Sequence, residues 1–382
     1  MFDFIVLGAT GMQGRIASRD LLKNGYSVLL CGRDKSKVEK LLKGYKKSEF
    51  EFVDLRDHNH TLSVLKISGA PVVLNCAEGD FNVSAMKAAL KAGIHYLDLG
   101  SEPGMTREQL GLNDAFKKKS LLALTGCGSA PGVVSVMARY ADQFFDTVDS
   151  VHAGFAWNSN MPVFVVPFSI DTVLEEFVEK APIFQEGRYV RKHPYDCKLE
   201  MEYKEIGKQK TQYAEHPEII TFPRFFQSKG VKNVSFFSSF PDHSRTVIEM
   251  LLNLGFASHK PLTVGDHDVS PVSFLTASLK NLKIPKGYTE KENLWVHITG
   301  KKNGLAKEVR MDCVARTLKG WEDATCNIDT GMPASIMAQM VKNGVIPDRG
   351  VFSPEFVVPH EPLFKELAKR KMYVYEDGKR IN

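Results

Sequence analysis

The sequence predicts an α/β protein: an N-terminal Rossmann fold (a doubly wound parallel sheet) and a second α+β domain. Three observations lead to this prediction. Short apolar runs alternate with helical patterns up to about residue 125, which is typical of βαβ units. A glycine-rich loop, residues 8–14, follows the first apolar run and opens a helical pattern. Longer strand-like runs replace this alternation after Pro131, and a chain of 382 residues is long enough for two domains.

The elements of the first domain can be assigned in order. A strand over residues 2–8 precedes a helix over 12–24, which Gly25 ends. After a strand over 26–31, Ser36 and Glu39 form a capping box at the start of the second helix. Thr106 and Gln109 are expected to cap a later helix. The other expected elements are strands at 50–54, 71–76, 95–100 and 121–125 and a helix at 82–92.

The second domain begins with a helical pattern over residues 132–145. Strand-like runs then follow at 150–157, 234–240, 294–300 and 309–318. Near Asp329 the pattern becomes helical again. We therefore assign residues 1–129 to the Rossmann domain and 130–329 to an α+β domain for substrate binding and dimerisation.

The glycine loop predicts a dinucleotide site. Glycines allow a tight turn and a close approach to a pyrophosphate, and the helix that follows presents free N–H groups and its positive dipole end. The spacing is G-x-x-G-x-x-G rather than G-x-G-x-x-G. The glycines therefore indicate a dinucleotide site only together with the βαβ pattern. The loop residues expected to bind the cofactor are Gly8, Thr10, Gly11, Met12 and Gln13.

The end of the second strand favours NADP. Arg33 is placed to pair with a 2′-phosphate, whereas NAD enzymes usually have an acidic residue at this point. Asp34 follows, so NAD remains an alternative; the other role for Asp34 is to cap the next helix. Further residues expected along the cofactor are Asp54 and Leu55 beside the adenine, and Asn75, Cys76 and Ala77 beside the ribose and nicotinamide.

Composition argues against several other classes of protein. The net charge of +5 is mild, and the short basic clusters are typical of solvated faces rather than a nucleic-acid site. Six scattered cysteines show no zinc spacing, so we expect no metal site and a reducing compartment. The uncharged stretches are interrupted by Gly, Pro, Ser and Asn, which argues against a membrane span. We expect a cytoplasmic protein with a small-molecule substrate, no nucleic-acid partner and no membrane association.

With these motifs in place, the sequence resembles the saccharopine dehydrogenase-like oxidoreductases, a family that includes saccharopine reductase, lysine 6-dehydrogenase and carboxynorspermidine dehydrogenase. The matching stretches span nearly the whole chain: residues 8–14, 73–77, 95–99, 126–132, 216–224, 330–331, 344–346, 350–351 and 354–355. The glycine loop alone is shared by many Rossmann enzymes. Its combination with the later stretches is specific to this family.

The resemblance implies properties that periodicity does not show. In that family the C-terminal segment, here residues 330–382, returns to pack helices on the Rossmann domain. Members are commonly homodimers and interconvert an amine and an imine by hydride transfer with a nicotinamide cofactor. The sequence also departs from the family in two places. Residues 238–243 lack an arginine that many relatives carry there. Residues 77–81 carry two extra carboxylates, Glu78 and Asp80, and we expect these to alter the charge preference for the substrate.

Candidate chemical residues lie beyond the carboxyl ends of the strands and in the second domain. Glu102 and His243 are the candidates for moving the amine proton. His216, Arg224 and Asp80 are the candidates for binding substrate, and Arg224 would clamp a carboxylate. For each of these residues, a structural or surface role is the competing interpretation.

The sequence leaves two alternative functions. A short-chain-type carbonyl reductase needs Tyr-x-x-x-Lys, and here only Tyr375 has a lysine, Lys379, four residues later, at the extreme C-terminus. A non-catalytic NADP-binding regulatory or scaffold protein would bind NADPH without turnover. The main interpretation is an NADP-dependent oxidoreductase acting at the C–N centre of an amino-acid-like substrate.

Overall fold

The first 124 residues form the predicted Rossmann fold. The computed structural model describes residues 1–166, 170–279 and 282–382. The elements of this part are β1 (Phe4–Leu7), α1 (Met12–Lys23), β2 (Val28–Gly32), the 3₁₀ turn η1 (Lys35–Val38), α2 (Glu39–Gly44), β3 (Ser48–Phe52), α3 (His58–Ser68), β4 (Val72–Asn75), η2 (Gly79–Phe81), α4 (Asn82–Ala92), β5 (His95–Asp98), α5 (Pro103–Leu110), α6 (Asn113–Lys118) and β6 (Leu122–Leu124).

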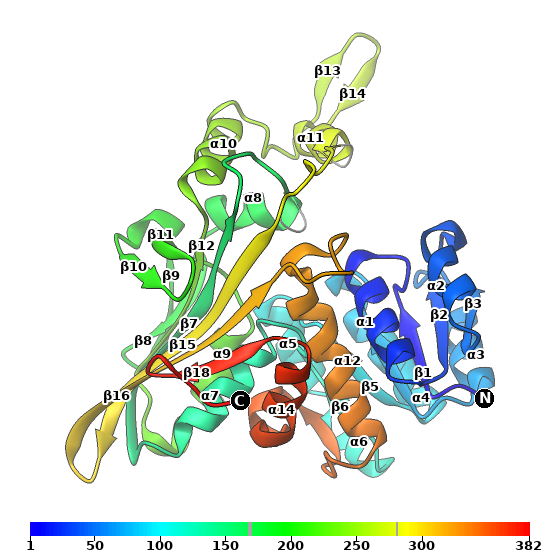
Figure 1. Ribbon diagram of the computed structural model, residues 1–382, viewed down its shortest axis with the longest axis horizontal. Helices are drawn as coiled ribbons and strands as arrows, with labels where there is room; N and C mark the ends of the chain where they lie inside the picture. Colours follow the sequence, from blue (N-terminus) through cyan, green and yellow to red (C-terminus); the bar gives the residue numbers. More distant parts are fainter. Residues whose placement is uncertain (167–169, 280–281) are drawn as a thin grey trace.

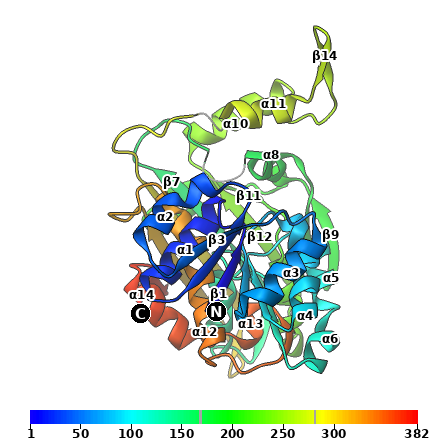
Figure 2. The same cartoon turned by 90° about the vertical axis from the view of Figure 1, so that its right-hand side faces the viewer.

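All strand pairs in the first sheet are parallel, and the strand order is β17-β6-β5-β4-β1-β2-β3. The chain order reverses between β1 and β4, and a doubly wound sheet binds ligands beyond the carboxyl ends of its strands at such a point. Figure 2 shows this sheet with its helices on both faces. The fold therefore directs the loops after β1, β4, β5 and β6 toward one edge of the domain.

Three local assignments need correction. The capping box at Ser36 is absent, because the Asp34 carboxylate accepts the Ser36 N–H at 3.0 Å and itself caps η1. Helix α5 begins at Pro103, with Thr106 and Gln109 buried inside it rather than capping it. Helix α3 was not predicted, since two of the four residues on its buried face, Thr61 and Ser68, are polar and weaken the apolar pattern.

The second domain is built on a 10-stranded mixed sheet, which Figure 1 shows in green and yellow beside the Rossmann domain. Its main path is β10-β11-β12-β7-β15-β16-β18-β19, and only β12 and β7 pair in parallel along this path. Its elements up to η5 are α7 (Val133–Asp142), β7 (Thr147–Ser159), α8 (Ile170–Val178), β8 (Ala181–Gln185), β9 (Arg188–Lys192), η3 (Pro194–Asp196), β10 (Glu200–Tyr203), β11 (Gly207–Tyr213), α9 (Glu218–Phe225), η4 (Gln227–Lys229), β12 (Asn233–Ser239), α10 (Asp242–Asn253), β13 (Leu262–Val264), β14 (His267–Val269), α11 (Pro271–Leu279), β15 (Glu290–Lys302), β16 (Leu305–Arg316) and η5 (Thr325–Asn327).

The last segment of the chain contributes to both sheets. It comprises α12 (Ile328–Lys342), β17 (Gly350–Phe352), α13 (Pro354–Val357), α14 (His360–Lys369), β18 (Tyr373–Glu376) and β19 (Lys379–Arg380). Helix α12 packs against α1, and β17 pairs with β6 at the edge of the Rossmann sheet. Strand β18, however, pairs with β16 of the second sheet. The segment expected to be helical therefore also supplies strands, and its end leaves the Rossmann domain.

A buried ion pair anchors this returning segment. Arg370, directly after α14, donates two hydrogen bonds to the Asp20 carboxylate of α1, at 2.8 and 2.7 Å. Ser335 of α12 donates to the same carboxylate at 2.7 Å. Arg370 and Asp20 are both buried. The network thus joins α1 to α12 and to the end of α14, which lie far from α1 in the sequence.

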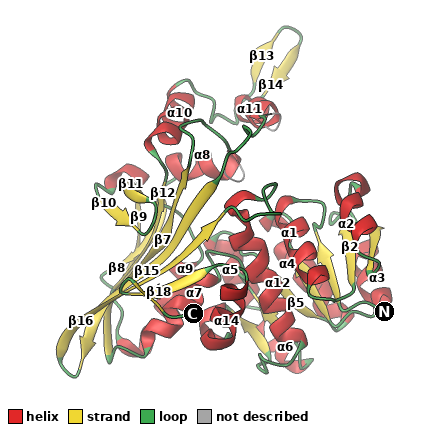
Figure 3. Ribbon diagram, viewed as in Figure 1, coloured by secondary structure: helices red, strands yellow, loops and turns green. Residues whose placement is uncertain are grey.

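Helices α7 and α9 pack against the second sheet, and buried side chains from both sheets form one continuous apolar cluster. Figure 3 shows the layers by secondary structure. No helix within the described residues is long and apolar enough to cross a membrane. The hairpin β13–β14 projects away from the rest of the molecule.

Candidate active site

A large cavity lies between the two domains, where the Rossmann strands end. It has a volume of about 1190 Å³. The loops after β4, β5 and β6 form one wall, and α8, α11 and residues 215–217 of the second domain form the other. We call this cavity the cleft. Its position is the one expected for a substrate that must reach a cofactor bound across the strand ends.

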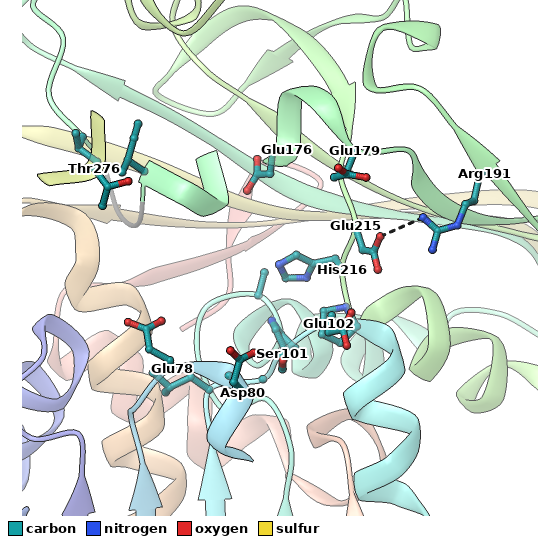
Figure 4. A pocket seen from close by; sticks show the side chains of 18 of the residues that line it. Glu78, Asp80, Ser101, Glu102, Glu176, Glu179, Arg191, Glu215, His216 and Thr276 are labelled. Atoms are coloured by element: carbon teal, nitrogen blue, oxygen red, sulfur yellow. Dashed lines mark ion pairs between the residues drawn. The ribbon is translucent and has the colours of Figure 1, made fainter. Parts of the chain in front are cut away.

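Carboxylates dominate both walls of the cleft (Figure 4). Glu78, Asp80 and Glu102 come from the Rossmann loops, and the opposite wall carries three more, Glu176, Glu179 and Glu215. Among the described lining residues the basic members are Arg191, which pairs with Glu215 at 3.7 Å, and His216. The cleft therefore has a negative charge excess, which favours a positively charged ligand.

His216 is held rigidly at the cleft wall. Its Nδ1 lies 2.5 Å from Oε2 of Glu218, whose side chain is fully buried at the start of α9. The imidazole also stacks on Phe236 of β12, with ring centroids 3.8 Å apart and an interplanar angle of 6°. These contacts fix the ring and leave Nε2 as the nitrogen without a fixed hydrogen-bond partner among the described residues.

A buried polar network holds the Rossmann loops of the cleft in place. The Asp98 carboxylate at the end of β5 accepts the N–H groups of Gly100 (2.9 Å) and Gly126 (2.8 Å) and the Gln109 amide (2.6 Å). Burial raises the pKa of Asp98, while these hydrogen bonds oppose that rise. One carboxylate thus connects the loops after β5 and β6. Asp98 was not among the predicted site residues: it lies in the family-matching stretch 95–99, but a single acid inside an apolar strand does not indicate which loops it holds.

Asn75 extends this network to the loop after β4. Its side-chain oxygen accepts the Ala77 N–H at 3.2 Å, and its amide donates to Oδ1 of Asn82 at 2.9 Å. Asn82 in turn donates to the Gly100 carbonyl at 3.0 Å. Asn75 therefore supports the loop from within the core, where its side chain is buried.

The glycine loop has the shape needed for a dinucleotide. A Cβ on Gly8 would lie 2.6 Å from the Ala77 nitrogen, and one on Gly14 would lie 2.2 Å from the Gly8 oxygen. A Cβ on Gly11 would meet only the Gly8 oxygen, at 3.2 Å, so this residue faces open space. Helix α1 begins there with no side-chain cap and no acidic residue in its first turn. Its N–H groups are therefore available to a pyrophosphate. Thr10, Met12 and Gln13 belong to the same turn and are partly exposed.

The adenosine end of the site also fits NADP. Asp34 is occupied with the Ser36 N–H and hydroxyl, whereas the neighbouring Arg33 is exposed and makes no hydrogen bond or ion pair among the described contacts. Hydrogen bonds from Arg56 lower the pKa of Asp54. Leu55 is buried beside this pair. Arg33 is thus the available cation for a 2′-phosphate.

Cys76 is buried, and burial raises the pKa of its thiol, so it stays a neutral packing residue. It lies between Asn75, which supports the loop, and Ala77, whose backbone contacts the glycine loop. The three residues therefore form the floor of the cofactor site near the cleft.

The structure brings Asp80, Glu102 and His216 together at the cleft, but two other candidates lie elsewhere. Arg224 is exposed near the end of α9, after the buried residues 218–223 of that helix. It is not among the described lining residues, so the predicted carboxylate clamp is not supported. His243, on α10, contacts Ser159 at 3.5 Å and also lies outside the described lining.

The structure excludes the Tyr-Lys pair of a short-chain reductase. Tyr375 lies on β18 and is paired with Asp312 of β16, and Lys379 lies on β19. Both strands belong to the second sheet, not to the strand ends of the Rossmann domain. The pair therefore cannot reach the cleft wall as that chemistry requires.

Comparisons with known proteins agree with this architecture. Residues 4–124 match the family model of the saccharopine dehydrogenase NADP binding domain, and residues 128–372 match that of the saccharopine dehydrogenase C-terminal domain. The predicted choice of NADP is thereby confirmed.

The chain is 25% identical over 394 residues to a carboxynorspermidine synthase of Vibrio alginolyticus, covering 94% of this chain and 93% of that protein. It is 24% identical over 395 residues to a carboxyaminopropylagmatine dehydrogenase of Synechocystis sp., covering 97% and 96%. Its fold is similar to that of a saccharopine dehydrogenase (L-Glu forming) from Saccharomyces cerevisiae, with a TM-score of 0.77, 15% identity and full coverage of both chains.

Proposed function

Because this chain belongs to the saccharopine dehydrogenase family, whose members act on C–N bonds with NAD(P), we propose that it is an NADP-dependent oxidoreductase for a substrate that is an amino acid with further positively charged nitrogen groups. The observation that carries the proposal is the acidic cleft at the ends of β4, β5 and β6. This proposal refines the amino-acid-like substrate that the sequence predicts, by adding positively charged groups to it.

The charge of the cleft decides between substrate classes. Carboxylates on both walls would repel a substrate that carries only carboxylates, and they would bind one with several ammonium or guanidinium groups. Nε2 of His216 would meet a single carboxylate of such a substrate, whereas Arg191 already pairs with Glu215. The names of the two relatives, carboxynorspermidine synthase and carboxyaminopropylagmatine dehydrogenase, also join a carboxyl group to an amine chain.

The chain's own residues would orient and protect the reacting bond. NADPH, when bound, supplies the hydride to the imine carbon. Hydride addition neutralises the positive charge of an iminium group, so the site needs no strong oxyanion donors. It needs a cleft that holds the substrate face in place and keeps water from hydrolysing the imine. The two carboxylate walls would hold the amine chain, and Glu102 would move the proton of the reacting amine.

A substrate survey tests this proposal. Purified protein and NADPH are incubated with pairs of a diamine or polyamine and an ω-aldehyde amino acid, and NADPH oxidation is followed by absorbance. We expect turnover with cationic pairs and much less with a dicarboxylic partner. NADPH binding without turnover of any pair would instead support the scaffold alternative.

Removing charge from the second wall is expected to weaken substrate binding. Glu176→Gln and Glu179→Gln should each raise KM for a polycationic substrate about tenfold with kcat nearly unchanged, since a charge-assisted hydrogen bond contributes roughly 1.5–3 kcal/mol. Steady-state kinetics measure the effect. Glu202→Gln, at an exposed carboxylate on β10, is the matched control and should leave KM unchanged. An unchanged KM in both cleft variants would contradict the assignment.

Arg33→Ala tests the cofactor site separately. We expect NADPH binding to weaken by about 1.5–3 kcal/mol, the range of a hydrogen bond to a charged group, and NADH binding to change little. Fluorescence titration with both cofactors measures this. Equal losses for NADPH and NADH would show that Arg33 does not contact the 2′-phosphate.

We further propose that the enzyme is a cytoplasmic homodimer. The family resemblance supports this, and all six cysteines are free, as is usual in a reducing compartment. Sedimentation equilibrium would test it, and a monomer at assay concentration would contradict it.

A further inference from the structure

The hairpin of β13 and β14 stands apart from both large sheets. Its two strands form a sheet of their own, joined by a two-residue turn, residues 265–266. Every residue from 258 to 268 is exposed. We call residues 258–270 the arm, and Figures 1 and 2 show that it projects beyond α10 and α11. A two-stranded hairpin alone in water is marginally stable at best, so we expect the arm to pack on another surface.

The two faces of the arm differ in polarity. Paired residues of an antiparallel hairpin share a face, and successive residues alternate between the faces. Thr263 pairs with Asp268, and the Thr263 hydroxyl donates to Oδ1 of Asp268 at 2.9 Å, so this face is polar. The other face is mainly apolar and carries Leu262, Val264 and Val269, with His267 beside the turn.

The apolar face of the arm is left in solvent. Leu262 and Val264 are 59% and 62% exposed. The helices at the base of the arm add Leu254, directly after α10, and Phe274 on α11, which are 67% and 57% exposed. Single exposed apolar residues are ordinary, but a group of them on one projecting part of a molecule marks an interaction surface.

The charges of the arm suit a second copy of the same arm. The base carries His259 and Lys260, and the turn at the tip carries Asp266, all of them exposed. If two arms pack antiparallel about a twofold axis, the base of each lies against the tip of the other. Lys260 of each copy then faces Asp266 of the other copy, so opposite charges meet at both ends of the contact.

We propose that the arm is a dimerisation element, which packs antiparallel on the arm of a second copy of this chain with the two apolar faces in contact. The inference rests on the proposed homodimer and assigns its interface. A twofold contact requires a self-complementary surface, and the arm offers one in both its apolar face and its divided charge. An unrelated partner would give no reason for opposite charges at the two ends of one hairpin.

The same contact would brace one wall of the cleft. Strand β14 ends at Val269 and α11 begins at Pro271, so an arm held by a second copy limits the movement of this helix. Thr276 and Leu279 of α11 line the cleft. We therefore expect the dimer to bind substrate more tightly than a monomer. NADPH binding depends on the Rossmann loops and should not change.

Reciprocal charge reversals test the antiparallel arrangement. Lys260→Glu and Asp266→Lys each place like charges at both ends of the contact, and each should raise the Kd of the dimer about tenfold or more at low ionic strength. Sedimentation equilibrium measures the Kd. An equimolar mixture of the two variants restores both pairs of opposite charge and should dimerise about as tightly as wild type. A mixture that associates no better than either variant alone would overturn the arrangement.

Substitutions on the two faces of the arm test which face is covered. Leu262→Lys puts two unpaired charges into the apolar contact of a twofold dimer and should raise the Kd about 100-fold or more. Thr263→Lys, at the next residue but on the polar face, is the matched control and should leave the Kd within about twofold. Circular dichroism checks that both variants are folded. Monomeric Leu262→Lys enzyme should have a KM for substrate about threefold or more above wild type, with unchanged NADPH affinity.

Several results would overturn the proposal. A dimer that Leu262→Lys leaves intact, or weakens no more than Thr263→Lys does, would place the interface elsewhere. Leu262→Lys that abolishes binding to anionic phospholipid vesicles but leaves the dimer intact would make the arm a membrane-binding element. A monomeric variant with the wild-type KM would show that the arm does not brace α11. If wild type dimerises through the arm but turns over no amine–aldehyde pair, the oxidoreductase function fails and the arm assignment stands.

Discussion

Replacing Glu102 with glutamine is expected to lower kcat by about 10²-fold or more, with little change in KM or in NADPH affinity. Glutamine keeps the shape of the side chain and its hydrogen-bonding reach, but it cannot accept or donate a proton at the reacting amine, and general acid–base groups contribute roughly 10²–10⁴-fold. Glu102 lines the cleft at the start of α5, on the loop that Asp98 fixes through Gly100. Steady-state kinetics with the best substrate of the survey measure the effect.

Glu108→Gln is the control for this substitution. Glu108 lies on the same helix, is exposed and pairs with Lys87 at 3.1 Å, outside the described lining of the cleft. It should leave kcat unchanged. A Glu102→Gln enzyme with wild-type kcat would mean that another group moves the proton. A rise in KM alone would place Glu102 in substrate binding.

Arg370→Ala should destabilise the protein by about 3–5 kcal/mol, the usual cost of leaving one partner of a buried ion pair without the other. Among the described residues, the Asp20 carboxylate would then keep the Ser335 hydroxyl and a longer contact from Gln339. Because the pair joins α1, α12 and the end of α14, the loss falls on the packing of the returning segment. Chemical denaturation, or the shift in Tm, measures it.

Lys43→Ala is the control for the loss of stability expected in Arg370→Ala. Lys43 pairs with Glu39 one turn away on α2, and both side chains are largely exposed. Exposed pairs of this kind contribute about 0.3–0.5 kcal/mol. If Arg370→Ala costs no more than Lys43→Ala, the buried network does not anchor the segment.

Local sequence patterns were sufficient to predict the strands of the Rossmann sheet and the long strands of the second domain. The alternation of strands and helices depends on neighbours within a few residues, so β1 to β6 could be read from the sequence, and the four long strands of the second domain overlap the predicted runs. Helix α3 was missed because polar residues occupy half of its buried face. The end of the chain was only partly anticipated, since the pairing of β18 with β16 depends on tertiary contacts.

The site was harder to predict for a geometric reason. Motifs located the glycine loop and the Rossmann wall, and the extra carboxylates Glu78 and Asp80 already indicated a changed charge preference. Whether a second-domain residue faces the cleft depends on how its element packs in the tertiary structure. Arg224 was a candidate by its chemistry but is exposed near the end of α9, whereas Glu176 and Glu179 were not chosen and line the opposite wall.

The position of β17 has a consequence for synthesis of the protein. Residues 122–124 pair with residues 350–352, so β6 stays an open sheet edge on the ribosome until residues 350–352 have emerged. Helix α12, which covers α1, also arrives late. At the usual rate of about 5–20 residues per second, the nascent Rossmann sheet waits for tens of seconds with one edge and one helical face uncovered. A chaperone that shields apolar surfaces would therefore act on this protein mainly during translation.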